Sequence, residues 1–275
     1  MAGPDANTLG EYLRARRERV DPADVGLRVT GARRTPGLRR EEVATLAGIS
    51  ADYYLRLEQG RDRNPSPPVL ESLARVYRLD PAATRYLLSL AAGPPRAPRP
   101  PSTEAVPPGI RALLGTLGLP AFVENRAFDV LAANAPATAL SPRIRSGRNR
   151  LRDVFLDDDE RALFPDWDEA AVGMVAAFRS SVGTDVDDPD VRALVGDLSA
   201  ASERFRDIWA RHDVVALAGG AARFRHPRLG PLELHREKLA IGDSSGQLLV
   251  IYHAEPGTDS ERSLRLLDET ATAHR

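Results

Sequence analysis

The sequence contains no cysteine, and only one of its 38 basic residues is a lysine, Lys238. The absence of cysteine excludes disulfides, thiolate metal sites and cysteine nucleophiles, and it is compatible with a reducing compartment. Arginine in place of lysine, together with many alanines, glycines and prolines, is typical of GC-rich coding rather than of a function.

Long apolar runs are also missing. No stretch approaches the roughly 18 residues of a membrane span, and the opening MAGPDANTLG lacks the basic and apolar regions of a secretory signal. A hydrophobic content of 42% over 275 residues is enough for a core in one large or two ordinary domains. We therefore expect a soluble, cytoplasmic protein with no membrane partner.

Common enzyme motifs are absent as well. The sequence has no G-x-S-x-G, P-loop, H-E-x-x-H or Rossmann glycine motif. His226, His235 and His253 fall on expected strands and could converge on a metal, but isolated strand histidines are usually hydrogen-bonded or exposed. We expect no catalytic residue, no metal and no cofactor.

Charge is divided unevenly along the chain, whose net charge is −1. Residues 1–93 have 15 arginines and 12 acidic residues, which gives +3, and residues 94–275 carry −4. A basic first half can face the phosphates of a nucleic acid while the acidic half faces water. An excess of +3 is compatible with nucleic-acid binding but is too modest to indicate it.

A proline-rich stretch, PPRAPRPPSTEAVPP at residues 94–108, coincides with this change of sign. Its seven prolines exclude a helix or central strand and predict an extended linker. We therefore predict a first domain over residues 1–93, a linker over 94–108, a second domain over 109–258 and a tail over 259–275.

The first domain is predicted to be all-α, with five helices. Each has an apolar stripe of helical spacing, and Thr8, Ser50 and Ser66 are expected N-caps. The second domain is predicted to be α+β, an antiparallel sheet covered by helices. Strands are expected in 120–134, 222–241 and 246–254, and helices in 168–183, 188–202 and 202–214. The continuous apolar run 248–252 predicts a strand buried on both faces.

Two of these helices are joined by a very tight turn in LAGISADYYLRLEQGR, residues 46–61. Such a pair is either a packing corner or a device for reading DNA. The residues expected in the core are Val43, Leu46, Ala47, Ile49, Tyr54 and Leu57. The opposite face of the second helix presents Ala51, Asp52, Leu55, Arg56 and Gln59.

This face has the chemistry of a recognition helix in a major groove. Arg56 can form a bidentate pair with guanine, and Asp52 can accept from cytosine or orient Arg56. Flanking arginines fall where phosphates would run. The expected DNA contacts are Arg39, Arg40, Ser50, Ala51, Asp52, Tyr53, Arg56, Arg61 and Arg63.

This region resembles the helix-turn-helix of the phage-repressor-like, xenobiotic-response-element (XRE) family. The resemblance covers residues 38–63, LRREEVATLAGISADYYLRLEQGRDR. The resemblance implies a lambda-repressor-like fold that binds double-stranded DNA, and a buried structural ion pair between Arg17 and Glu58. One departure is the long stretch DPADVGLRVTGARRTPG, residues 21–37. Its Arg33 and Arg34 belong either to a solvated loop or to a basic arm that touches the DNA backbone.

Most of the chain resembles regulators related to the methylenomycin-cluster regulator MmyB. The matching stretches include RRTPGLRREEVA, FDVLAANAPATAL, LVGDLSAASERFRDIWARHDV and LLVIYHAEPGT. The resemblance implies a PAS-like C-terminal domain that binds a lipophilic, fatty-acid-like effector between sheet and helices, and it implies a repressor. Asn134 is expected to cap the helix after its strand.

The chemistry of an apolar pocket with a polar end suggests contacts for such an effector. Arg211 and His212 either anchor a carboxylate or simply cap a helix C-terminus. The other expected contacts, each also a reasonable core residue, are Phe122, Phe128, Met174, Phe178, Phe205, Trp209 and Tyr252.

These features predict a transcription regulator that binds an inverted-repeat operator as a homodimer, because one recognition helix reads only about four or five bases. The alternative is a DNA-binding protein whose second domain only dimerises or binds a partner protein. A packed core without a cavity would favour the alternative.

Overall fold

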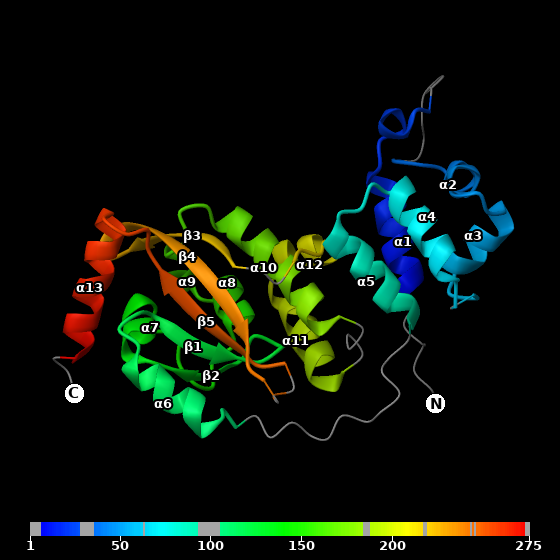
Figure 1. Ribbon diagram of the computed structural model, residues 1–275. Helices are drawn as coiled ribbons and strands as arrows, with labels where there is room; N and C mark the ends of the chain where they lie inside the picture. Colours follow the sequence, from blue (N-terminus) through cyan, green and yellow to red (C-terminus); the bar gives the residue numbers. More distant parts are fainter. Residues whose placement is uncertain are drawn as a thin grey trace.

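The structure is a computed structural model that describes residues 7–27, 36–62, 64–92, 105–183, 188–216, 219–242, 244 and 246–272. The expected DNA contact Arg63, both arginines of the long loop and most of the proline-rich linker lie outside these residues. The described chain forms two lobes (Figure 1). Among the described helices, none is both long and apolar enough to cross a membrane.

The described residues of the first lobe form five α-helices, as the sequence predicts, and one short 3-10 helix that was not predicted. They are α1 Thr8–Arg19, η1 Pro22–Val25, α2 Arg40–Ala47, α3 Ala51–Glu58, α4 Pro67–Val76 and α5 Pro81–Ala92. Gly48 turns the chain from α2 toward α3 at a φ of 71°, a left-handed conformation that favours glycine. The Ser50 side chain then caps α3 by accepting a hydrogen bond from the Tyr53 amide at 3.1 Å.

Two local predictions for this lobe need correction. The N-cap of α1 is Asn7, whose side chain accepts from the Gly10 amide, so Thr8 is the first helical residue. Leu46 is 37% exposed rather than part of the core. The reason is geometric, because Val43, Ala44 and Ala47 form the buried stripe of α2 and Leu46 lies beside it on the helix surface.

The second lobe is built on a five-stranded antiparallel sheet in the order β2-β1-β5-β4-β3. Its strands are β1 Ala121–Glu124, β2 Val130–Ala133, β3 Gly220–His226, β4 Gly230–Ala240 and β5 Leu248–His253. The expected two-sided burial of β5 is confirmed, because Val250 and Tyr252 enter one apolar cluster and Leu249 enters another on the opposite face. Its place at the centre of the sheet explains this pattern.

Helices cover both faces of this sheet. They are α6 Pro108–Thr116, α7 Ala135–Leu140, α8 Arg150–Leu156, α9 Asp158–Ala162, α10 Trp167–Val182, α11 Pro189–Ala201, α12 Glu203–Trp209 and α13 Asp259–Thr272. Helix α6 contributes Leu114 to the apolar cluster on one face of the sheet. Asn134 caps α7 as predicted, accepting from the Ala137 amide at 3.0 Å.

The expected C-terminal tail contains the helix α13, which packs beside α7 and β4 (Figure 1). Leu264 and Leu267 are buried in the same cluster as Val250. The helix was not anticipated because it follows the last strand without a strong sequence signal. We propose that the second domain extends beyond residue 258 to include α13.

Candidate ligand pocket and nucleic-acid interface

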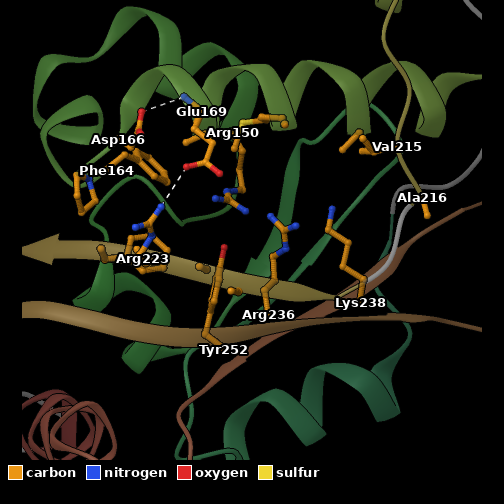
Figure 2. Close-up of a pocket in the computed structure, with 18 residues that line it drawn as sticks. Arg150, Phe164, Asp166, Glu169, Val215, Ala216, Arg223, Arg236, Lys238 and Tyr252 are labelled. Carbon is orange, nitrogen blue, oxygen red and sulfur yellow. Dashed lines mark hydrogen bonds and ion pairs between the residues drawn. The ribbon is translucent and has the colours of Figure 1, made fainter. Parts of the chain in front are cut away.

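A cavity of about 350 Å³ lies between α10 and the β3–β4–β5 side of the sheet. Small residues of α10, among them Ala170, Gly173 and Ala177, form its helical wall. Phe164 and Asp166 lie toward one end, while Val215 and Ala216 lie toward the other (Figure 2). The cavity thus occupies the position between sheet and helices that a ligand-binding domain would use.

The floor of the cavity is rich in positive charge. Arg236 and Lys238 extend side by side from β4, and Arg150 points toward them from α8 (Figure 2). The Lys238 Nζ lies 2.7 Å from Glu124 Oε1, and Arg150 Nη1 lies 4.0 Å from Glu124 Oε2. Glu124 is therefore the buried counter-ion of two of these three cations.

Hydrogen-bonding capacity remains unused at this floor. The Nε atoms of Arg150 and Arg236 are buried without a hydrogen-bond partner among the described residues. Burial works against the charge of Arg150, yet neighbouring Tyr252 and Glu124 raise the pKa of its guanidinium above the usual value, so it stays charged. Buried cations and unsatisfied donors are costly to maintain, and an anion placed among them would offset that cost.

The cavity also has an apolar lining and an exposed rim. Met174, Phe164 and Phe224 supply apolar surface, and Arg223 pairs with Glu169 at 3.1 Å across the rim. A cavity with an apolar wall and a concentrated polar end suits an amphiphilic ligand.

Of the nine residues expected to contact a ligand, Met174 and Tyr252 line this cavity. Phe122 is buried in the sheet cluster. Phe128, Phe178, Phe205 and Trp209 pack with one another and with neighbouring helices, with ring centroids 5.6–5.9 Å apart for Phe128–Phe178, Phe178–Trp209 and Phe205–Trp209. These four side chains therefore belong to a core cluster.

Arg211 and His212 also lie outside the cavity, and the expectation that they anchor a carboxylate there is corrected. Their backbone carbonyls face α1 of the first lobe, where Arg19 and Arg16 donate to them. His212 adopts a φ of 54°, which carries the chain from the end of α12 toward that lobe.

Sequence reasoning missed Arg150, Arg236 and Lys238 as pocket residues. A sequence signal existed for Arg236 and Lys238. Alternate residues of a strand share one face, so both lie on the same inward face of β4 as the buried Leu232 and Leu234. Nothing local indicates Arg150, which belongs to a short helix that was not predicted.

The expected DNA-reading surface is present on α3. Ala51, Asp52, Arg56 and Gln59 are exposed, whereas Tyr54 and Leu57 are buried. Asp52 forms an ion pair with Arg56 one turn later, and the Arg56 guanidinium lies 5.8 Å from the centre of the Tyr53 ring. These contacts orient the Arg56 side chain at the surface, which is the role that the sequence suggests for Asp52 beside an arginine that pairs with guanine.

The other expected DNA contacts in the described part of the chain surround this helix. Arg39, Arg40, Ser50 and Arg61 are exposed at the ends of α2 and α3. Helix α2 begins at this surface, where Glu42 accepts a hydrogen bond from the Arg39 amide at 2.7 Å. Arginine side chains and helix starts therefore surround α3 in the arrangement that backbone contacts require.

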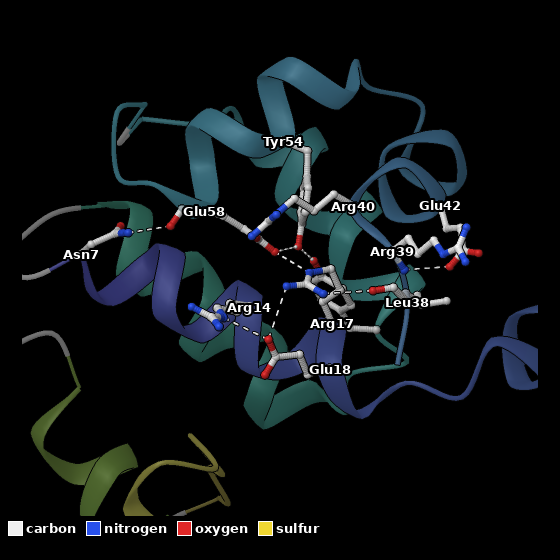
Figure 3. Close-up of polar contacts among 11 residues, drawn as sticks. Asn7, Arg14, Arg17, Glu18, Leu38, Arg39, Arg40, Glu42, Tyr54 and Glu58 are labelled. Carbon is white, nitrogen blue, oxygen red and sulfur yellow. Dashed lines mark hydrogen bonds and ion pairs between the residues drawn. The ribbon is translucent and has the colours of Figure 1, made fainter. Parts of the chain in front are cut away.

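A buried ionic hub holds α3 against the rest of the lobe (Figure 3). Arg17 Nε lies 2.6 Å from Glu58 Oε1, and both side chains are almost completely buried. The Tyr54 hydroxyl donates to the same carboxylate at 2.8 Å. The ion pair implied by the family resemblance is thus present. Burial opposes the charge of Glu58, but hydrogen bonds from Arg17 and Arg40 lower the pKa of the carboxyl.

Arg40 has a structural contact that the sequence did not suggest. Its Nε lies 2.6 Å from Glu58 Oε2, although nearly half of its side chain is exposed. Replacing Arg40 would therefore disturb the hub as well as any phosphate contact. Arg39 and Arg61 are cleaner probes of the DNA backbone.

The three strand histidines do not converge. His226 is buried, with Nε2 3.1 Å from the Ala139 carbonyl oxygen and Nδ1 accepting from the Leu229 amide. His235 and His253 stack on each other across β4 and β5 with ring centroids 5.2 Å apart. Within the described ranges no group of three histidine or carboxylate side chains is arranged to hold a metal ion.

Comparison with known families agrees with both lobes. Residues 8–87 match the model of a helix-turn-helix domain, and residues 106–267 match the MmyB-like transcription regulator ligand binding domain. The fold and the two sites thus define a DNA-binding transcription regulator with a ligand-binding domain. The chain belongs to the family of MmyB-like transcription regulators, whose domain model covers more than half of it. Among curated proteins, none matches the sequence.

Proposed function

We propose that this regulator is a repressor that binds an inverted-repeat operator as a homodimer and responds to a lipophilic anion bound in the second lobe. The single observation that carries the ligand assignment is the cavity floor of Arg150, Arg236 and Lys238. Two of these three cations, Arg150 and Lys238, share one buried carboxylate, Glu124. The excess positive charge favours a ligand with a carboxylate or a similar acidic group.

The remaining surface of the cavity supports the lipophilic part of this assignment. Met174, Phe164 and the alanines of α10 would contact an alkyl or other apolar group. A volume of about 350 Å³ lies at the lower end of the range for small-molecule pockets, roughly 300–1,000 Å³. A medium-length fatty acid meets both requirements.

The direct test is native mass spectrometry of the protein purified from its host. A retained acidic small molecule supports the proposal. The pocket variant Arg236→Met/Lys238→Met should lose it, whereas Arg223→Met at the rim should retain it. A protein that carries no small molecule and shows no thermal shift with a series of fatty acids would contradict the ligand assignment.

The DNA part of the proposal rests on the exposed face of α3 and its flanking arginines. A single helix contacts too few base pairs for a unique operator, so a dimer with two α3 helices is expected to supply the second half-site. Selection of bound sequences from a random DNA pool should return two inverted half-sites. A single, non-repeated site would contradict the dimer.

The alternative is a second lobe that only dimerises or binds a partner protein. The cavity and its unsatisfied arginine donors speak against this alternative, because a purely structural core would fill such a space with packed apolar side chains.

A further inference from the structure

One short segment, residues 211–216, lies between the cavity and the first lobe. It follows α12 and leads toward β3, and α12 is the helix next to α5 in Figure 1. Its residues divide into two groups, since 211–214 contact the first lobe and Val215 and Ala216 line the cavity.

The contacts on the first-lobe side are both ionic and apolar. Asp213 forms ion pairs with Arg16, at 3.2 Å, and with Arg19, and both arginines belong to α1. Arg16 also donates to the His212 carbonyl. Val214 is buried in the apolar cluster of the first lobe, together with Tyr12 and Tyr86. Val214 is therefore part of the core of the DNA-binding lobe, and the residues before it are tied to α1.

The contacts on the cavity side tie the same segment to α10. The Val215 amide donates to Ser180 Oγ at 3.1 Å. Ala177, one turn earlier on α10, lines the cavity with Val215 and Ala216. Figure 2 places Val215 and Ala216 at the end of the cavity nearest Lys238. A ligand whose acidic group approaches Lys238 would therefore meet this segment.

Helix α10 provides a second connection. Arg179 is fully buried, its Nη2 donates to the Trp209 carbonyl at 2.6 Å, and its guanidinium lies 3.7 Å from the centre of the Trp209 ring. Arg179 also lies near Tyr86 on α5 of the first lobe. Burial raises the pKa of the Tyr86 hydroxyl, and the positive charge of Arg179 is close enough to oppose this rise. The helix that walls the cavity thus also reaches the first lobe.

We propose that residues 211–216 couple occupancy of the cavity to the placement of the DNA-binding lobe. A group that displaces Val215 and Ala216 moves Asp213 and Val214, which are held by α1 and by the core of the first lobe. Because adjacent residues of one backbone serve both sites, occupancy and docking share a free energy of coupling. This inference rests on the proposed function, since the cavity must accept a ligand for the coupling to operate.

The location of the contact suggests the form of the response. Helices α1 and α5 face the second lobe, whereas α3 lies on the far side of the first lobe (Figure 1). The segment therefore does not cover the recognition helix. A shift of the contact would instead reorient the two α3 helices of a dimer relative to successive major grooves.

The test uses the full chain and does not require a ligand at first. Because the chain contains no cysteine, spin labels can be placed on Thr45→Cys in α2 and Ala193→Cys in α11, both exposed, and the distance between lobes measured by pulsed electron resonance. Ala177→Phe adds bulk against Val215 and should shift the distance distribution. Ala170→Phe, the matched control, adds the same bulk to the same helical wall farther from the segment and should leave the distribution unchanged.

The coupling is then examined by removing the ionic contact. Asp213→Ala should abolish the shift produced by Ala177→Phe. Asp207→Ala, which removes an exposed carboxylate from α12, should preserve it. An unchanged distribution in Ala177→Phe, or a shift that persists with Asp213→Ala, would overturn the proposal. If Ala177→Phe does not fold, Ala177→Met carries the same test with a smaller group.

A second set of measurements uses dodecanoate as the probe and separates the two proposals. Titration followed by calorimetry reports binding, and the labelled chain reports movement. Absence of dodecanoate binding with an intact response to Ala177→Phe would contradict the ligand class and leave the coupling in place. Binding with no change in distance, or with the same change in Asp213→Ala, would contradict the coupling and leave the ligand assignment in place.

Discussion

Glu58 receives three side-chain hydrogen bonds, from Arg17, Arg40 and Tyr54, and two of these partners, Arg17 and Tyr54, are themselves buried. Replacing Glu58 by glutamine keeps the shape and removes the charge, so Arg17 is left as a buried cation without its counter-ion. We expect Glu58→Gln to lower the free energy of unfolding by about 3–5 kcal/mol. Urea denaturation would measure the loss, with the exposed Glu41→Gln as control. A loss below about 1 kcal/mol would be typical of a surface pair and would contradict the burial argument.

Arg56 and Arg39 separate base reading from backbone binding. Arg56 is exposed and oriented by Asp52, so Arg56→Ala should relax base preference at one operator position by roughly 1–3 kcal/mol. Arg39→Ala should weaken binding to matched and mismatched operators alike and reduce the salt dependence of affinity. Competition binding with single-base operator variants distinguishes these effects. Equal losses on every sequence for Arg56→Ala would remove it from base recognition.

At the scale of elements, α13 belongs to the core of the second lobe although the sequence suggests only a tail. Leu264 is 2% exposed and contacts the sheet cluster. We expect Leu264→Ala to destabilise the second lobe by about 2–5 kcal/mol, the usual cost of emptying a buried leucine site. Leu266→Ala, at a half-exposed position of the same helix, should change stability by less than about 0.5 kcal/mol. Thermal unfolding of the two variants compares them directly, and equal effects would show that α13 does not pack as described.

Helix α10 illustrates how one element can carry two roles. Its small residues open the cavity toward the sheet, while Arg179 and Ser180 hold Trp209 and Val215 near the first lobe. Helical geometry requires this division, because residues about 100° apart around the axis face different neighbours. Sequence periodicity predicts the helix but not which neighbour each face meets.

At the scale of the whole molecule, His212 makes the contact between lobes sensitive to acid. Burial, followed by the charges of Arg179 and Arg16, lowers its pKa to about 3, and Asp213 opposes this shift only weakly. An undocked His212 would have its usual pKa near 6.5 and would take up a proton first as the pH falls. The docked arrangement should therefore be fully stable above pH 6.5 and lose stability as the pH decreases from 6.5 toward 3.

This prediction can be checked with the spin-labelled chain at pH 7.5 and pH 5.5, a range in which most carboxylates stay ionised. The interlobe distances should broaden at the lower pH. His212→Asn removes the titrating group, and asparagine tolerates the left-handed backbone at this position, so its distances should not depend on pH. Equal broadening in both proteins would assign the effect to another group.

Elements with local signals were predictable from the amino-acid sequence. The five helices of the first lobe, the Gly48 turn and the exposed face of α3 follow from apolar spacing and capping residues, and the family pattern implied the Arg17–Glu58 pair. The antiparallel sheet and its central buried strand were also predictable from alternation and from the apolar run in β5.

The position of the cavity and the residues that border it depend on long-range packing, which local sequence patterns do not specify. Glu124, Arg150 and Lys238 come from three separate segments and meet because β1, β4 and α8 pack together. Four of the aromatic residues predicted as a pocket wall, Phe128, Phe178, Phe205 and Trp209, pack in a core cluster instead. Residues 211–214 contact the first lobe, where Arg16 of α1 lies nearly 200 positions before His212. Local periodicity specifies which face of an element is buried. Long-range packing specifies what that face meets, and the ligand site depends on the latter.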